Sequence, residues 1–72
     1  MRGITYVRLY FRDDYDEDAI AEVIESFGTD AELDAELRSA KFAGSPERAQ
    51  EFIRACENIE PLVSVRMRTI NL

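Results

Sequence analysis

The chain has 72 residues, with nine Lys and Arg, fifteen Asp and Glu and no His, and its formal net charge is −6. Hydrophobic residues make up 46% and charged residues 33%, which is typical of a folded domain and too apolar for a disordered tail. We expect a single domain, residues 1–72, with one thin core and no deep catalytic cavity.

The absent residue types exclude several functional classes. Without His, the chain lacks the commonest general base and a common zinc ligand. With Cys56 alone, it has no internal disulfide and no cysteine metal cluster. The first residues show no apolar signal segment, and no stretch approaches the roughly 20 apolar residues that span a membrane. We therefore expect a cytoplasmic protein with no metal, no cofactor and no membrane contact.

Residues 4–12 predict a strand, because their apolar and polar side chains alternate. One face would carry Thr5, Val7, Leu9 and Phe11, and the other Tyr6, Arg8, Tyr10 and Arg12. A helix follows, with one apolar stripe made of Ile20, Val23, Ile24 and Phe27. Asp14 and Glu17 resemble a capping box at its start, and Gly28 suits the left-handed position after its end.

Residues 31–37 alternate strictly between apolar and charged side chains, which favours a strand. A helix capped by Thr29, with Leu33 and Leu37 one turn apart, is the competing interpretation. The alternation changes phase near Arg38, and a phase change fits a hairpin or a bulge better than a continuous helix. We favour strand structure here and leave a hairpin, one long strand and a helix open for residues 31–43.

Ser45 and Pro46 predict the start of a second helix, since Ser is a good N-cap and Pro suits the first helical position. The apolar stripe of this helix consists of Ala49, Phe52, Ile53 and Cys56, and Pro61 ends the segment. A final strand alternates from Val63 to Ile70. The order β-α-β-β-α-β predicts a two-layer α/β (α+β) sandwich of the ferredoxin-like kind, with two helices on one face of an antiparallel sheet and the first and last strands adjacent.

The charge is distributed unevenly along the chain. Residues 13–36 contain eleven acids and no Lys or Arg, whereas the remaining residues carry nine bases and four acids. Such a block often forms only a solvated face and a protected sheet edge. Read as functional, it predicts a docking surface for a basic protein. The candidate contacts are Asp14, Asp16, Asp18, Glu22, Glu25, Glu32, Asp34 and Glu36.

Carboxylates at helical and strand spacing can imitate a row of phosphates. The leading hypothesis is therefore a small non-catalytic inhibitor or adaptor that occupies a nucleic-acid-binding surface, as small phage anti-defence (anti-CRISPR-like) proteins do. Asp14, Asp16, Asp18 and Glu25 also match four positions of a calcium-binding loop. The glycine that this loop requires is Ala19 here, so we expect capping chemistry and no metal site.

The sheet face opposite the helices is the alternative binding surface. Aromatic and Arg side chains would interleave there, namely Tyr6, Arg8, Tyr10, Arg66 and Arg68. Such a face can form a homodimer interface or can stack bases, as in RNA-recognition modules. Direct nucleic-acid binding is the weaker of these two, because an acidic strand lies nearby and the usual RNA-binding signature is absent.

We predict no catalytic residue in this chain. Nothing marks any carboxylate as desolvated, and a solvated acid is a poor acid or base at neutral pH. Cys56 lies on the apolar stripe of the second helix and has no His to activate it. We therefore interpret Cys56 as a core residue.

Overall fold

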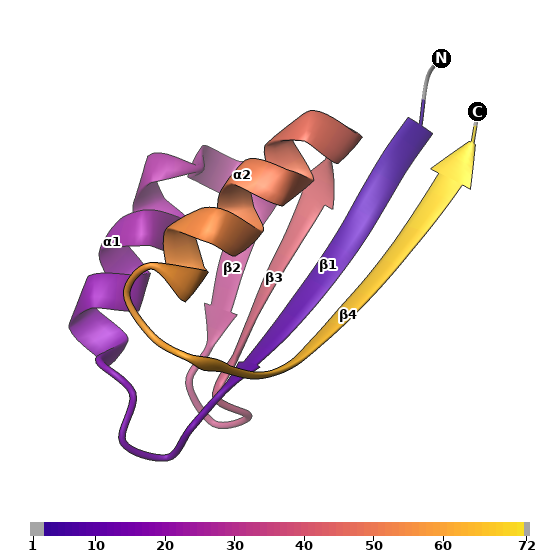
Figure 1. The fold of residues 1–72 in the computed structure, drawn as a ribbon. Helices are drawn as coiled ribbons and strands as arrows, with labels where there is room; N and C mark the ends of the chain where they lie inside the picture. Colours follow the sequence, from indigo (N-terminus) through magenta and orange to yellow (C-terminus); the bar gives the residue numbers. More distant parts are fainter. Residues whose placement is uncertain (1–2, 72) are drawn as a thin grey trace.

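The computed structural model describes residues 3–71, which form four strands and two α-helices in the order β-α-β-β-α-β. The elements are β1 (Gly3–Phe11), α1 (Glu17–Ser26), β2 (Ala31–Asp34), β3 (Ser39–Gly44), α2 (Pro46–Glu57) and β4 (Leu62–Asn71). A single 3-10 turn, Gly28–Asp30, joins α1 to β2. Figure 1 shows both helices on one face of the sheet. This is the predicted α+β class, with the predicted element order.

All strand pairs in the sheet are antiparallel, in the order β2-β3-β1-β4. The predicted adjacency of the first and last strands is confirmed, because β1 pairs with β4 along its whole length. The β1–β4 register is regular from Gly3 to Tyr10, and a bulge at Val63 follows. β1 is therefore an interior strand, and Tyr6, Arg8 and Tyr10 on its outer face each have a neighbour on both sides.

Residues 31–44 form a hairpin, which resolves the alternatives that the sequence left open. β2 and β3 pair from Ala31 opposite Phe42 to Asp34 opposite Ser39. The Asp34 carboxylate accepts a hydrogen bond from the backbone N–H of Leu37, which stabilises the turn. Arg38 has a φ of 52°, so the chain reverses through a left-handed residue. The phase change at Arg38 therefore marks the turn of the hairpin, and the helical interpretation was wrong.

The start of α1 differs from the prediction. Asp16, and not Asp14, is the N-cap, and its side chain accepts a hydrogen bond from the backbone N–H of Ala19. The Asp16 N–H in turn donates to the carboxylate of Glu60 at 2.7 Å. This reciprocal arrangement resembles a capping box whose second acid comes from the loop after α2. The predicted pair of Asp14 and Glu17 was wrong because Glu60, which completes the cap, is distant in sequence.

The other helix ends follow the sequence. Gly28 has a φ of 69° directly after the α1 C-cap, as expected of a left-handed C′ glycine. The Ser45 hydroxyl accepts a hydrogen bond from the N–H of Arg48, and Pro46 occupies the first turn of α2. No helix within residues 3–71 has the length and apolar character needed to cross a membrane.

An aromatic cluster forms the centre of the core. The Phe42 and Phe52 rings stack with their centroids 5.2 Å apart, and Phe27 meets each of them edge-on. The inner face of β1 contributes Val7 and Leu9, both almost fully buried. Edge-to-face and offset-stacked pairs are the favoured aromatic geometries, so these rings fix how α2 lies on the sheet.

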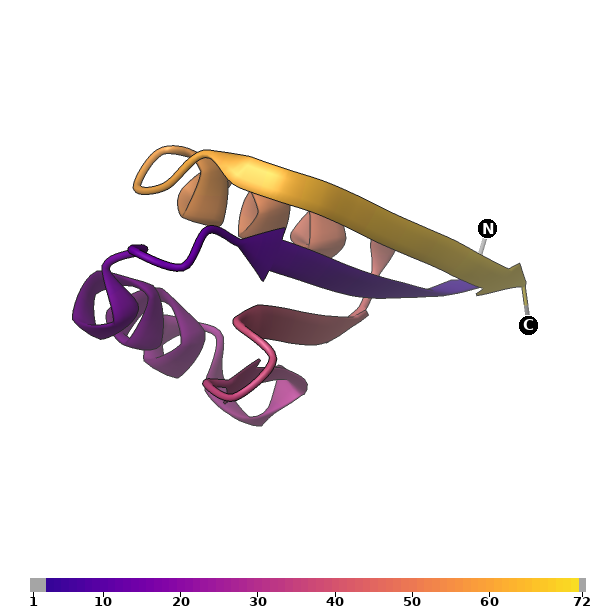
Figure 2. The same ribbon diagram turned by 90° about the horizontal axis from the view of Figure 1, so that it is seen from below.

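The helix layer leaves β4 uncovered. Nine of the ten β4 residues are exposed, including Val63 at 63%, Val65 at 45% and Met67 at 51%. The register places Val65 beside buried Leu9 and Met67 beside buried Val7, on the same face of the sheet as the helices. In Figure 1, β4 lies beyond α2, and in Figure 2 the end of β4 extends past both helices. Val65 and Met67 therefore form an exposed apolar stripe, whereas Leu62 at the start of β4 packs against the core.

Replacing Phe52 by Ala should lower the free energy of unfolding by about 3–5 kcal/mol, because the change leaves a cavity beneath two other rings. Chemical denaturation followed by circular dichroism measures this loss. Ile59→Ala is the matched control, because Ile59 is 39% exposed and should lose far less. Equal losses in the two variants would contradict the assignment of the core.

Candidate functional site

The candidate site is the face of the sheet that the helices do not cover, called the open face below. Pairing between the strands places residues of all four strands side by side there. One row runs across the sheet from β2 to β4, and it consists of Glu32, Lys41, Arg8 and Arg66. In the next row Tyr6 lies between Ala43 and Arg68. Cross-strand neighbours of this kind have side chains within contact distance.

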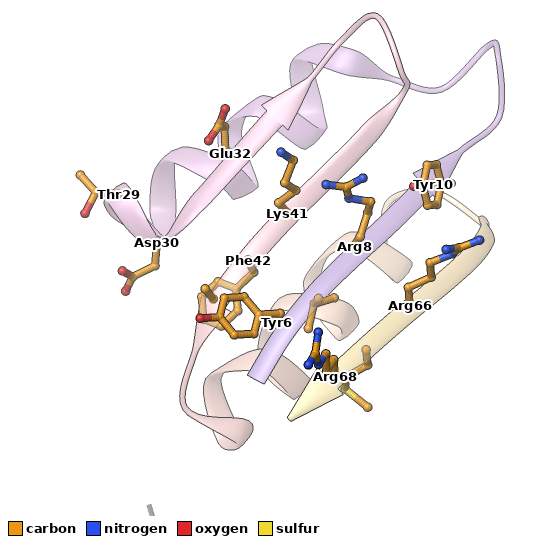
Figure 3. Close-up of a pocket in the computed structure, with 13 residues that line it drawn as sticks. Tyr6, Arg8, Tyr10, Thr29, Asp30, Glu32, Lys41, Phe42, Arg66 and Arg68 are labelled. Atoms are coloured by element: carbon orange, nitrogen blue, oxygen red, sulfur yellow. The ribbon is translucent and has the colours of Figure 1, made fainter. Parts of the chain in front are cut away.

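These side chains line a shallow groove of about 600 Å³. Figure 3 shows Tyr6, Arg8 and Tyr10 on β1, between Lys41 of β3 and the two Arg side chains of β4. Tyr6 is 46% exposed, so its ring is available for stacking. The predicted sheet-face residues Tyr6, Arg8, Tyr10, Arg66 and Arg68 all line this one groove.

The cations of the groove are free of ion pairs within the described part of the chain. The salt bridges there involve other residues: Arg38 pairs with Asp13 at 3.0 Å, and Arg12 approaches Asp14 at 3.8 Å. Arg8, Lys41, Arg66 and Arg68 therefore present four positive charges with no carboxylate within salt-bridge distance. A concentration of unpaired charge of one sign creates a local field, which attracts anions.

Lys41 completes the cationic group, and it was not among the predicted site residues. Its signal was present in the sequence, because Lys41 lies between the buried apolar residues Ala40 and Phe42. The choice between strand and helix over residues 31–43 had to be settled before Lys41 could be assigned to a face. Thr29 and Asp30 also line the groove, and their position depends on the 3-10 turn after α1.

The acidic block is divided between separate surfaces. Asp18, Glu22 and Glu25 are exposed on α1, in the helix layer. The strand register places Glu32 and Asp34 on the open face, where they form an acidic rim along β2. The remaining predicted contacts occupy loops and caps: Asp14 precedes α1, Asp16 caps it and Glu36 lies in the hairpin turn. The eleven acids therefore do not form one uninterrupted surface.

Metal binding and acid–base chemistry have little support in this arrangement. Within residues 3–71 no three Cys, Asp or Glu side chains gather in a way that would hold a metal ion. The calcium-loop match is helical from Glu17 onward, so its carboxylates cannot encircle one ion. Burial of Tyr15 and the nearby carboxylate of Glu17 raise the pKa of Tyr15, which keeps its hydroxyl protonated.

Cys56 is fully buried on α2, as predicted for a core residue. Burial raises the pKa of its thiol to about 12, because the interior disfavours the thiolate. The thiolate is the nucleophilic form of cysteine, so this side chain is unreactive in the folded protein at neutral pH.

Comparisons of the chain with models of protein families, with curated proteins and with solved structures found no match. The site is therefore interpreted from its own geometry and charge.

The raised pKa of Cys56 predicts a loss of stability at alkaline pH. Above about pH 9 the unfolded chain releases the thiol proton while the folded protein retains it, so the unfolded state binds fewer protons. The free energy of unfolding should then fall by up to about 1.4 kcal/mol per pH unit until the pH reaches the folded pKa. Urea denaturation from pH 8 to 11 measures this slope. Cys56→Ala should show a shallower decline, and an unchanged slope in this variant would contradict the prediction.

Proposed function

We propose that this chain is a non-catalytic binding module whose open face takes a single-stranded nucleic-acid segment. One observation carries the proposal: four cations without ion pairs surround two tyrosines on one uncovered sheet face. Bases stack on exposed aromatic rings, and Arg and Lys neutralise the phosphates between them. We therefore favour the open face over the acidic block as the binding surface, because the fold divides the acids between separate surfaces.

The fold supports the same proposal. The element order, the antiparallel pairing and the strand order β2-β3-β1-β4 support a ferredoxin-like arrangement. RNA-recognition modules use the uncovered face of such a sheet, which is an analogy of fold and not a proof of function. The sequence departs from these modules, because both tyrosines belong to β1 and the usual RNA-binding signature is absent. We infer a cytoplasmic location for this module.

The acidic rim limits how a strand could lie on the open face. Glu32 and Asp34 on β2 repel phosphates, whereas Arg66 and Arg68 on β4 attract them. We therefore expect the phosphates to follow β4 and the bases to point toward Tyr6. The net charge of −6 opposes approach from a distance, so affinity depends on these local contacts.

Tyr6→Ala should weaken binding of a fluorescent single-stranded oligonucleotide by about 1–3 kcal/mol, the usual contribution of one stacked base. Arg66→Gln should also weaken it and should reduce the salt dependence, log K against log salt, by about 0.7. Fluorescence anisotropy over a range of salt concentrations measures both effects.

Arg54→Gln is the matched control, because it removes one exposed Arg from α2 without changing the sheet. Its affinity and salt dependence should equal those of the unmodified protein. Absence of binding at low salt, or an equal effect of Arg54→Gln, would refute nucleic-acid binding by the open face.

A second candidate function uses the acids of α1. Asp18, Glu22 and Glu25 occupy positions i, i+4 and i+7 of one helix, are exposed and form no salt bridge within residues 3–71. This supports the hypothesis of an acidic inhibitor or adaptor that docks on a basic protein and imitates nucleic acid. This function would use the negative surface of α1, whereas the first function uses the positive open face.

Reversing Asp18, Glu22 and Glu25 to Lys should abolish capture of a basic partner if this second function holds, because like charges would then face each other. Affinity capture from the native host, followed by calorimetry with the purified partner, measures the effect. Reversing the exposed α2 acids Glu47 and Glu51 is the control. Unchanged binding by the α1 variant would eliminate this candidate.

A further inference from the structure

The two edges of the sheet differ in how they are protected against pairing with another strand. β2 is one edge, has only four residues and carries Glu32 and Asp34. Short, charged edge strands are a common defence against edge-to-edge association. β4 is the other edge, and it has ten residues, nine of them exposed. Its outer backbone groups have no strand partner within residues 3–71, so this edge is open to a further strand.

The side chains of β4 also favour association. On the helix side of the sheet, Val65 and Met67 form a stripe with exposed fractions of 45% and 51%. Ile59, in the turn after α2, is a further exposed apolar side chain, at 39%. The charged residues Arg66 and Arg68 point to the open face and leave this stripe without charge. An apolar stripe beside an unpaired strand edge is typical of a protein interface.

We propose that β4 pairs antiparallel with β4 of a second copy of this chain, with Val65 opposite Val65 of the second copy. The two sheets would then join into one sheet of eight strands. A two-fold axis perpendicular to the sheet relates the copies, so both helix layers lie on the same side. Both open faces also lie on one side, and together they form a single cationic surface.

The charge pattern of β4 selects this register. With Val65 at the two-fold axis, Arg66 lies opposite Ser64 of the second copy. A register centred on Met67 would instead place Arg66 opposite Arg68, and a register centred on Arg66 would place this residue opposite itself. Like charges directly opposite each other destabilise a strand pair. The register centred on Val65 therefore avoids both of these like-charge pairs.

A second copy is a better occupant than an unrelated peptide for two reasons. The apolar stripe meets an identical stripe, so Val65 and Met67 of both copies cover one another. Each copy supplies the same open edge, so one pairing satisfies the backbone groups of both. This inference does not depend on nucleic-acid binding, because it concerns the edge and the helix side of β4.

The test is the molecular mass of the full chain in solution, measured by sedimentation velocity over a dilution series. We expect a concentration-dependent dimer. Val65→Lys should raise the dissociation constant at least about tenfold, because a charge within the apolar stripe disfavours edge pairing. Val65→Thr keeps the branched shape and should keep most of the dimer. A monomer at every concentration, or an unchanged dimer in Val65→Lys, would overturn the proposal.

A cysteine at the two-fold axis tests the register. Val65→Cys should form a disulfide-linked dimer under mild oxidation, whereas Met67→Cys alone should not. The native Cys56 does not interfere, because it is buried and remains protonated at the pH of the experiment. Circular dichroism confirms that each variant is folded. Cross-linking through Met67→Cys but not through Val65→Cys would overturn this register. If β4 binds added peptides while the chain itself stays monomeric, pairing with a second copy is refuted.

Discussion

The helices of this protein are much shorter than its longest strands, and the exposed surfaces depend on that difference. α1 has 10 residues and α2 has 12, so they span about 15 and 18 Å. β4 has 10 residues and spans roughly 33 Å. The aromatic cluster of Phe27, Phe42 and Phe52 fixes α2 against the middle of the sheet. With α2 held there, no helix remains to cover β4.

The charge on the open face changes from negative at the β2 edge to positive at the β4 edge. Along one row of the open face the residues change from Glu32 through Lys41 and Arg8 to Arg66, from one edge to the other. The acidic edge is short, and α1 with its own acids lies on that side of the molecule (Figure 1). The basic edge is long and apolar on its other face. The β2 edge therefore carries charges that disfavour pairing with another strand. The β4 edge instead combines cations on the open face with exposed apolar side chains on the helix side.

Local patterns predicted much of this structure. Alternation assigned Tyr6, Arg8 and Tyr10 to the face opposite Val7 and Leu9, because the two-residue period of a strand needs no tertiary information. Ser45 with Pro46, and Gly28, marked helix ends through requirements of the backbone itself. The sheet-face residues of the candidate site were found in the same way, whereas Lys41, Thr29 and Asp30 were not.

The remaining features depend on contacts between distant parts of the chain. The N-cap of α1 was assigned to Asp14, but Asp16 occupies this position. The cap is completed by the Glu60 carboxylate, which lies beyond α2 and accepts a hydrogen bond from the Asp16 N–H. Val65 and Met67 have the same pattern as buried Val7 and Leu9, and only the position of α2 leaves them exposed. The acidic block looked continuous in sequence, but both acids of β2, Glu32 and Asp34, lie on the open face, whereas Asp18, Glu22 and Glu25 lie on α1.

We propose the open face as the binding surface of this protein. Titration of the isotope-labelled chain with a short single-stranded oligonucleotide, followed by amide chemical shifts, maps the contact directly. We expect the largest shifts at Tyr6, Arg8 and Arg66, with little change along α1. Shifts confined to the acidic face of α1, or no shifts at low salt, would contradict it.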